Sequence, residues 1–359
     1  MERRVTLKDI ARAANVSIGT VDRAINDRGR ISDETKTLIM SKIEEMKYRP
    51  NAIASTLRKQ KQHTIALVIP GNNAFFQAII NGAMKACAEL DDYRIALQPV
   101  LQASEEEPLR QLADFTSIVN SAQAGGAYNG IIVAPLHAKL SPVIDQAADM
   151  GMKVVTVNID AKNSKRICYI GQDPWRTGGI VAAIIGKSMN NTGEVVIMQA
   201  AHSRASWRQR TEGFSHVLRN DYPGIHIAGT VPYENDQQAA YTAAMEVLHG
   251  KPGIGGIFAD TTTGILGAGM AIRDSGRKGR VIAVMYDTPP EGIRLLDDNV
   301  FIAAITQNPF FQGYYAAKIM CRILLEQYKP EKEMWYTSAD IIVNSRQMVL
   351  NEGSVNNIL

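Results

Sequence analysis

Polar and aromatic residues follow several short apolar stretches of this chain, at the points where those stretches end. They are Asn73, Phe75, Phe76, Asn158, Asp160, Thr261, Asp287 and Gln307. Carboxylate and amide groups can hydrogen-bond to several hydroxyls at once, and phenyl rings can cover the apolar face of a sugar ring. These residue types favour a binding site for a sugar or another small polar molecule. Asn and Asp after a strand are also common turn formers and helix caps, so each position has a structural alternative.

The apolar stretches indicate the fold that positions these residues. They alternate with amphipathic stretches of helix length and cover residues 65–69, 95–97, 131–134, 154–157, 195–198, 256–259, 281–285 and 302–305. This alternation is typical of an α/β protein with parallel sheets and helices on both faces, and the number of strands predicts two such sheets. Because ligands of open α/β sheets bind beyond the carboxyl ends of the strands, the polar residues are expected to meet there.

The N-terminal 49 residues have a different pattern. Thr6, Ser17 and Ser32 can each cap a helix, and the apolar spacing after each of them predicts one. The turn between the first two helices is only a few residues long, so these helices must cross steeply and leave one face of the second helix free for the major groove of DNA. The sequence therefore predicts a small all-α helix-turn-helix headpiece over residues 1–49.

The exposed start of the second predicted helix carries side chains that can read bases. Arg23 can bond guanine through two hydrogen bonds, Ile18 can contact a thymine methyl group, and Asp22 can accept a hydrogen bond from cytosine N4. Gly19 has no side chain to read with, so it suggests a close approach to the groove. The other DNA contacts and helix caps expected in the headpiece are Thr6, Ser17, Thr20, Asn26 and Arg30.

Charge is distributed unevenly along the chain. Residues 1–61 carry 14 Lys and Arg against 8 Asp and Glu, a net charge of +6, whereas the remaining residues carry 25 against 28, a net charge of −3. A basic head on a mildly acidic body is what phosphate binding by one end requires.

Over Thr6 to Leu57, the chain resembles the headpiece and hinge helix of the LacI/GalR family of bacterial repressors. The matching motifs are Val-Ser-x-x-Thr-Val-x-Arg at residues 16–23 and Tyr-x-Pro-Asn at residues 48–51. The resemblance implies that Ile18, Gly19 and Arg23 are reading positions, and that a hinge helix capped by Asn51 orders on DNA. In that helix the implied contacts are Asn51, Ala54 and Leu57, with Leu57 inserted into the minor groove.

The body resembles a type I periplasmic sugar-binding protein, with two α/β lobes and a ligand cleft between them. The resemblance implies a hinge and linker over residues 50–63 and an effector-binding domain over residues 64–359. Its N-lobe is expected at about 64–160 plus 288–308 and its C-lobe at about 161–287 plus 309–345. The implied cleft residues are Asn73, Phe75, Phe76, Asn158, Arg210, Asn235, Thr261, Asp287 and Gln307. Asp160 is expected there because it follows a strand, and Trp207 can either line the cleft or pack in the second lobe. Asn158, Asn235 and Thr261 depart from the residue types common in that family.

Other classes of protein find little support in the sequence. No strict phosphate-binding loop, dinucleotide fingerprint, nucleophile elbow or zinc-binding helix is present, so we expect neither an enzyme nor a cofactor. Three widely spaced cysteines do not suit a metal site or a disulfide framework and favour a reducing compartment. The N-terminus has no apolar signal core and no apolar run reaches membrane-spanning length, which predicts a cytoplasmic protein and argues against a solute-binding protein.

The combined prediction is a homodimeric repressor that binds double-stranded operator DNA and a small polar effector, without any membrane contact. A sugar or polyol is the expected effector, and a purine or a phosphorylated sugar is the alternative. Closure of the lobes around the effector would move the two hinge segments relative to each other and so change operator affinity.

Overall fold

The computed structural model describes residues 7–25, 31–46, 63–71, 73–90, 95–102, 108–123, 128–201 and 204–346. The chain divides into two compact units, with the main boundary between residues 61 and 62. We call the first unit the headpiece and the second the body, and we describe each by itself.

The headpiece contains three short helices, α1 (Leu7–Ala13), α2 (Ile18–Ile25) and α3 (Asp33–Glu45). They share a small core in which Ile10, Val21 and Ile39 are fully buried. Ser32 caps α3 by accepting a hydrogen bond from the backbone N–H of Thr35. The predicted helix-turn-helix is therefore present in the described part of this unit.

The body contains two mainly parallel six-stranded sheets. The first sheet has the order β11-β5-β4-β3-β1-β2 and the second has the order β12-β10-β9-β8-β6-β7. The strands of the first sheet are β1 (His63–Pro70), β2 (Ile95–Gln102), β3 (Tyr128–Val133), β4 (Lys153–Val157), β5 (Cys168–Gly171) and β11 (Met334–Tyr336). Those of the second are β6 (Gly193–Ala200), β7 (Ile225–Tyr233), β8 (Ile254–Ala259), β9 (Ile282–Tyr286), β10 (Ala303–Ile305) and β12 (Ile341–Ile342). Only the β10–β12 pair is antiparallel among the strand pairs described.

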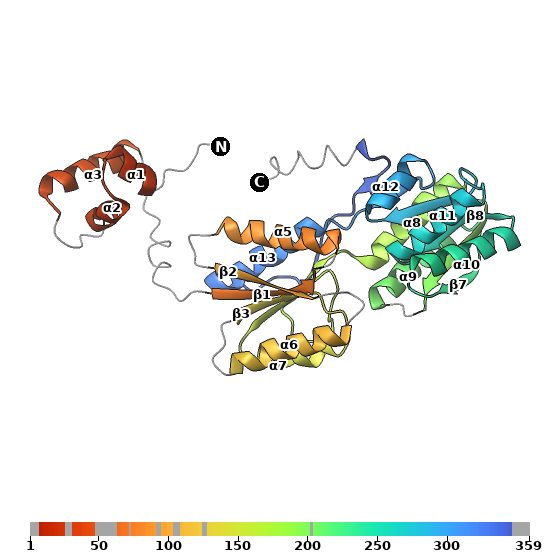
Figure 1. Ribbon diagram of the computed structural model, residues 1–359, viewed down its shortest axis with the longest axis horizontal. Coiled ribbons are helices and arrows are strands. Elements are labelled where there is room, and N and C mark those ends of the chain that lie inside the picture. Colours follow the sequence, from red (N-terminus) through yellow and green to blue (C-terminus); the bar gives the residue numbers. More distant parts are fainter. Residues whose placement is uncertain are drawn as a thin grey trace. The chain divides into compact units, whose positions relative to one another are not determined.

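Helices cover both faces of each sheet. In the first lobe, α5 (Ala74–Ala88) and α13 (Pro309–Glu326) lie on one face and α6 (Pro108–Gln123) and α7 (Leu140–Asp149) lie on the other (Figure 1). In the second lobe, α8 (Pro174–Ser188) and α9 (Ala205–Asp221) cover one face. The opposite face is covered by α10 (Gln237–Gly250), α11 (Thr262–Asp274) and α12 (Pro290–Asp297).

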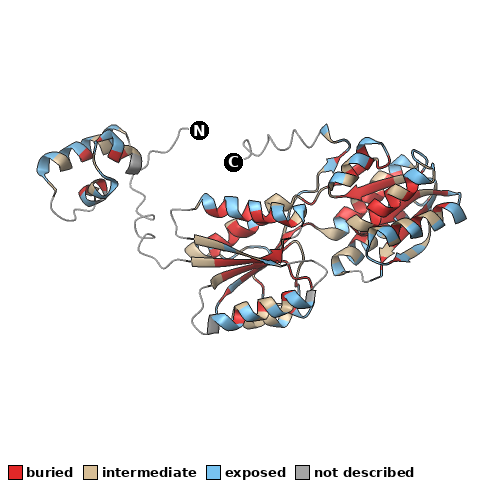
Figure 2. Cartoon of the chain, in the orientation of Figure 1, coloured by how far each residue is buried: buried red, intermediate tan, exposed pale blue. Residues whose placement is uncertain are grey.

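The strand residues alternate between these two layers. On β1, Leu67 packs against the α5 and α13 layer, whereas Val68 packs against the α6 and α7 layer. On β6, Val195 and Val196 divide between the two faces of the second sheet in the same way. Figure 2 shows the buried residues gathered on the strands and on the helix faces turned toward them. The near-continuous apolar runs of the sequence are thus explained by sheets that are buried on both faces.

Glycines allow the covering helices to pack closely in both lobes. A Cβ atom on Gly82 of α5 would overlap the carbonyl oxygen of Phe310 in α13, and one on Gly313 would overlap that of Ile79. In the second lobe, a Cβ atom on Gly178 of α8 would overlap the carbonyl oxygen of Arg210. A Cβ atom on Gly213 of α9 would overlap the carbonyl oxygen of Trp175. The two lobes therefore repeat one arrangement, and α9 begins where α5 does, beyond the carboxyl end of the first strand of its sheet.

The lobe bounds expected from the sequence differ from those of the two sheets. The β5 strand pairs with β4, and α13 packs on the first lobe, so residues 161–171 and 309–336 do not belong to the C-lobe. The β10 strand pairs with β9, so the segment with α12 and β10 does not belong to the N-lobe. The chain crosses between lobes after β5, after β10 and between β11 and β12. The expectation failed because β5 and β11 have only four and three residues and left no clear apolar run.

Candidate functional site

A cavity of about 600 Å³, including space open to solvent, lies at the carboxyl ends of the strands of both sheets. The first lobe contributes Phe75, Phe76, Asn158, Ile159, Tyr169 and Gln172 to its lining. The second lobe contributes Pro174, Arg204, Ser206, Trp207, Arg210, Asp287 and Gln307. The equivalent positions Phe76 and Trp207, each in the first turn of its helix, supply an aromatic ring from each lobe. Rings and polar groups together suit a ligand with both an apolar face and hydroxyl groups.

A chain of hydrogen bonds connects the polar residues of the second lobe. Arg210 is 6% exposed and donates to Gln307 Oε1 over 2.9 Å, and Gln307 Nε2 donates to Asp287 Oδ2 over 2.7 Å. The guanidinium carbon of Arg210 also lies 4.3 Å from the centre of the Tyr286 ring. Burial raises the pKa of Asp287 above its ordinary value, although the charge of Arg210 opposes this shift. The network fixes the positions of two opposite charges and one amide on the cavity wall.

Two buried polar atoms of the cavity lining have no hydrogen-bond partner among the described residues. They are Nε of Arg210 and Oε1 of Gln172, whose side chain is 3% exposed. The amide nitrogen of Gln172 donates to the carbonyl oxygen of Thr306 over 2.8 Å, which connects two of the segments that cross between lobes. Buried polar groups are nearly always satisfied, so a ligand that bonds to these atoms would recover a cost that the protein otherwise bears.

Backbone geometry explains two residue types on the cavity wall. Asn158 after β4 and Asp287 after β9 have φ angles of 63° and 59°, in the left-handed region that Asn and Asp tolerate best. These strands hold equivalent places in the two sheets. The same side chains therefore turn the backbone and line the cavity.

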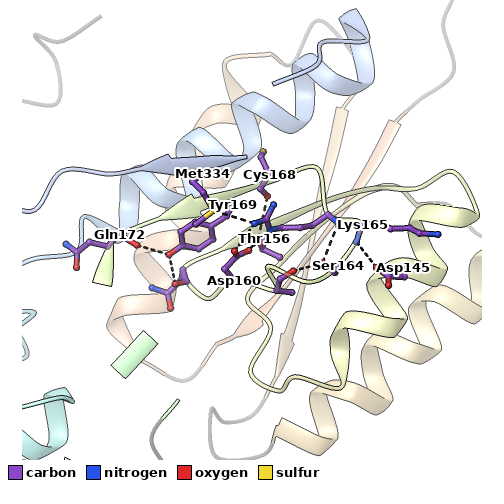
Figure 3. Close-up of polar contacts among 12 residues, drawn as sticks. Asp145, Thr156, Asp160, Ser164, Lys165, Cys168, Tyr169, Gln172 and Met334 are labelled. Carbon is purple, nitrogen blue, oxygen red and sulfur yellow. Dashed lines mark hydrogen bonds and ion pairs between the residues drawn. The ribbon is translucent and has the colours of Figure 1, made fainter. Parts of the chain in front are cut away.

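Asp160 does not line the cavity and forms an ion pair within the first lobe. Its Oδ1 accepts a hydrogen bond from Thr156 Oγ1 over 2.8 Å, and its Oδ2 accepts one from Arg166 over 2.8 Å (Figure 3). A second bond from Arg166 makes the pair bidentate, and the Arg166 side chain is 2% exposed. The expectation that Asp160 contacts an effector is not supported, because its carboxylate oxygens are used within the turn after β4.

Three further residues expected at the cleft do not line the cavity. Asn73 caps α5 by accepting from the N–H of Phe76 over 3.0 Å. Thr261 caps α11 and lies 2.6 Å from the hydroxyl of Tyr233. Asn235 accepts a hydrogen bond from Thr263 over 3.2 Å. Side chains of this type after a strand serve equally well as helix caps, and these three hold capping or loop contacts.

Several lining residues were not expected from the sequence. Tyr169 and Gln172 lie on and just after β5, the short strand that was not recognised. Arg204 and Ser206 lie at the start of α9, before Arg210. Their position at the beginning of a helix after a predicted strand was the available signal. Ile159 and Pro174 complete this group.

The headpiece presents an exposed face on α2. Ile18 is 44% exposed, and Gly19 and Arg23 are also exposed, whereas Val21 and Ala24 are buried on the opposite side. Ser17 accepts a hydrogen bond from the N–H of Thr20 over 3.1 Å and so caps α2. Asp22 belongs to α2, but its side chain is not described. The expected contacts Thr6, Asn26, Arg30, Asn51, Ala54 and Leu57 lie outside the described residues.

Neither a metal centre nor a membrane span is found in the described ranges. No group of three or more His, Cys, Asp and Glu side chains in these ranges is placed to hold a metal ion. None of the helices described is long and apolar enough to cross a membrane.

Comparisons with known proteins match both parts of the chain. Residues 6–51 match the family model "Bacterial regulatory proteins, lacI family", and residues 65–327 match "Periplasmic binding protein domain". The chain is similar to the ribose operon repressor of Bacillus subtilis (strain 168), with 25% identity that covers 90% of this chain and 92% of the relative. It is also similar to the probable HTH-type transcriptional repressor ExuR of Bacillus subtilis (strain 168), with 26% identity over 68% of this chain and 69% of the relative.

The fold of the body matches solved sugar-binding proteins. One is GanP, a glucose-galactose binding protein from Geobacillus stearothermophilus, with a TM-score of 0.68 and 23% identity. The match covers 79% of this chain and 98% of that protein. At this identity the comparison establishes the fold of the body and leaves the ligand to be argued from the site.

Proposed function

The chain belongs to the LacI family of bacterial regulatory proteins and carries a periplasmic binding protein domain, and on this premise we propose that a sugar or polyol bound in the cavity controls its affinity for operator DNA. It is a DNA-binding transcriptional regulator and not an enzyme. We further propose that it acts as a repressor in the cytoplasm. The observation that carries the proposal is the Arg210–Gln307–Asp287 network on a cavity whose lining comes from both lobes.

The control mechanism follows from a ligand that touches both lobes. Such a ligand binds more tightly when the lobes are closed around it, so it shifts the population toward that arrangement. In the proposed homodimer, two headpieces lie over a pseudo-palindromic operator, and movement of the lobes displaces the two hinge segments relative to each other. Ile18, Gly19 and Arg23 are the proposed base-reading positions on the exposed face of α2.

The first test is ligand binding by the full chain. A thermal-unfolding screen should compare sugars, polyols, sugar phosphates and nucleosides, because a ligand that binds only the folded state raises the unfolding midpoint. Trp207 provides a second signal, since it lines the cavity and its fluorescence should respond to an occupied site. Stabilisation by nucleosides alone would replace the sugar with the alternative purine effector.

The second test separates ligand control from DNA binding. Asp287→Ala should abolish the response of operator binding to the sugar found in the screen and leave operator affinity without sugar unchanged. Asp298→Ala is the matched control, because Asp298 is an exposed carboxylate of the same lobe that does not line the cavity. Unchanged sugar affinity in Asp287→Ala would remove Asp287 from the site.

A further inference from the structure

Two arginine side chains line the cavity, one just before α9 and one in its second turn. They are Arg204, the N-cap residue, and Arg210. Asp287 is the only acidic residue among the cavity-lining residues described. The two arginines and Asp287 together therefore carry one positive charge more than negative, with Tyr169 neutral because burial raises its pKa.

Arg210 and Asp287 offset each other within the network. Gln307 accepts from Arg210 and donates to Asp287, so both charges are held by one amide. Arg210 also donates to the carbonyl oxygen of Asp260 over 3.4 Å. These two residues are therefore suited to hydroxyl groups, to which a guanidinium donates and from which a carboxylate accepts.

Arg204 is not part of this network and lies against the ring of Trp207 in the cavity lining. Its guanidinium carbon lies 4.9 Å from the centre of the Trp207 ring, and the side chain is half-buried. A guanidinium stacked on an indole is pre-organised in orientation, and its planar set of donors matches the two oxygens of a carboxylate or phosphate. A ring that lies against Trp207 would bring a substituent of the sugar close to this group.

The backbone adds to the positive character of the wall. The first turns of α5, α8 and α9 all contribute lining residues, namely Phe76, Pro174 and Ser206. Helix N-termini carry a partial positive charge. The buried Nε of Arg210, which has no hydrogen-bond partner among the described residues, is an independent sign that a ligand acceptor belongs in this cavity.

We propose that the effector is a monosaccharide with one anionic group, a carboxylate or a phosphate, and that Arg204 binds this group beside Trp207. The proposal rests on the proposed function, since it specifies the sugar that the same cavity takes. Asp287 and Arg210 bind the hydroxyls of the ring, and the aromatic residues contact its apolar face. A neutral sugar of the same stereochemistry has no anionic oxygens, so it lacks the ion pair and the bidentate hydrogen bonds to Arg204.

The test is isothermal titration calorimetry of the full chain with matched sugars. Each set contains a neutral sugar, the corresponding uronic acid and the corresponding sugar phosphate: glucose, glucuronate and glucose 6-phosphate; galactose, galacturonate and galactose 6-phosphate; ribose, riburonate and ribose 5-phosphate. In at least one set we expect an anionic member to bind about tenfold or more tightly than its neutral partner, a difference typical of a charge-assisted contact. The acid and phosphate arms identify which anionic group the site takes.

Two variants locate the contact. Arg204→Gln should reduce the affinity for the anionic sugar about tenfold or more and reduce the affinity for its neutral partner by a much smaller factor. Arg208→Gln is the matched control, because Arg208 is exposed on the same helix and does not line the cavity. An unchanged thermal midpoint without ligand shows that each variant is folded.

The outcomes separate this proposal from the one it rests on. Neutral sugars that bind as tightly as their anionic partners would overturn the anionic effector and leave the sugar-controlled regulator in place. An equal loss of affinity in Arg204→Gln and Arg208→Gln would overturn the role of Arg204. If no sugar of any set binds, the proposal of a sugar effector and the proposal of an anionic group on it are both contradicted.

Discussion

The carboxylate of Asp287 lies in a place that disfavours its charge. Burial raises its pKa, while Arg210 and the amide of Gln307 act in the opposite direction. Its backbone is also in the left-handed region, with φ at 59°. A residue that combines an unfavourable charge with a demanding backbone conformation is typical of a binding site whose cost is offset elsewhere in the fold.

This carboxylate gives a pH-dependent prediction. Because the folded-state pKa is above the ordinary value of 3.8, the folded protein binds this proton more tightly than the unfolded chain does. The ionised group therefore lowers stability at neutral pH. Asp287→Asn should raise the free energy of unfolding of the ligand-free protein at pH 7, and the gain should shrink as pH falls through the folded-state pKa toward 3.8.

Urea unfolding of both proteins over a series of pH values measures this difference. A gain that is constant across the series, or a loss at neutral pH, would contradict the electrostatic explanation. The same variant is expected to lose sugar affinity, so stability and binding should change in opposite directions.

The ion pair of Asp160 and Arg166 leads to the reverse expectation. Removal of one partner leaves a buried charge without its counter-ion, so Asp160→Ala should destabilise the protein by about 3 to 5 kcal/mol. The carboxylate does not line the cavity, so the folded variant should keep its sugar affinity. Urea unfolding measures the loss of stability. Calorimetry at a temperature where the variant is folded measures its sugar affinity. A loss of sugar affinity at unchanged stability would restore Asp160 to the site.

At the residue scale, the position of a side chain after a strand was only partly informative. It led to Asn158, Asp287 and Gln307, which line the cavity. It led equally to Asp160 and Thr261, because an acceptor after a strand can bond to a neighbouring turn or to a helix N-terminus instead. The sequence does not contain the distances that distinguish these partners.

At the scale of elements, close helix packing fixes where the cavity residues lie. Gly213 lets the backbone of α9 approach Trp175 at the start of α8, and Arg210 and Arg204 project from the turns just before it. Gly82 and Gly313 let the backbones of α5 and α13 approach each other closely, and Phe76 projects from the start of α5. The helix starts that carry the aromatic and basic residues are thus held by backbone contact.

Gly213→Ala should therefore be strongly destabilising, by about 3 kcal/mol or more, because the added Cβ meets a carbonyl oxygen of a packed helix. Gly250→Ala is the control, since a Cβ at the end of α10 would have no described atom within 4 Å. That change should alter stability by no more than about 1 kcal/mol. Thermal and urea unfolding compare the two variants. Similar effects of both substitutions would show that the α8–α9 contact can relax.

Long elements were predictable from the sequence and short ones were not. The run from Ile65 to Ile69 is long and apolar, and it forms the centre of β1 as expected. In contrast, β5 and β11 contain four and three residues, too few to show the apolar pattern of a buried strand. Because pairing over long sequence distances decides which sheet a short strand joins, the crossings after β5 and between β11 and β12 could only be seen in the structure, whereas the expected bound at 308/309 coincides with the crossing after β10.

At the scale of the whole molecule, the chain combines a basic DNA-binding unit with a body that encloses a polar cavity. Residues 1–61 carry the net charge of +6 and the body carries −3, so electrostatic attraction to DNA is confined to one end. A ligand in the body can control DNA binding only if it has different affinities for the free and the DNA-bound states. The factor by which the sugar changes operator affinity must then equal the factor by which the operator changes sugar affinity.

The most direct test of ligand control is therefore a reciprocal titration of the full chain. An operator obtained by selection from random DNA is titrated with and without the saturating sugar from the screen, and the sugar is titrated with and without saturating operator. We expect both dissociation constants to change by one common factor, of about 5 to 150. Operator affinity that is the same with and without bound sugar would contradict this expectation.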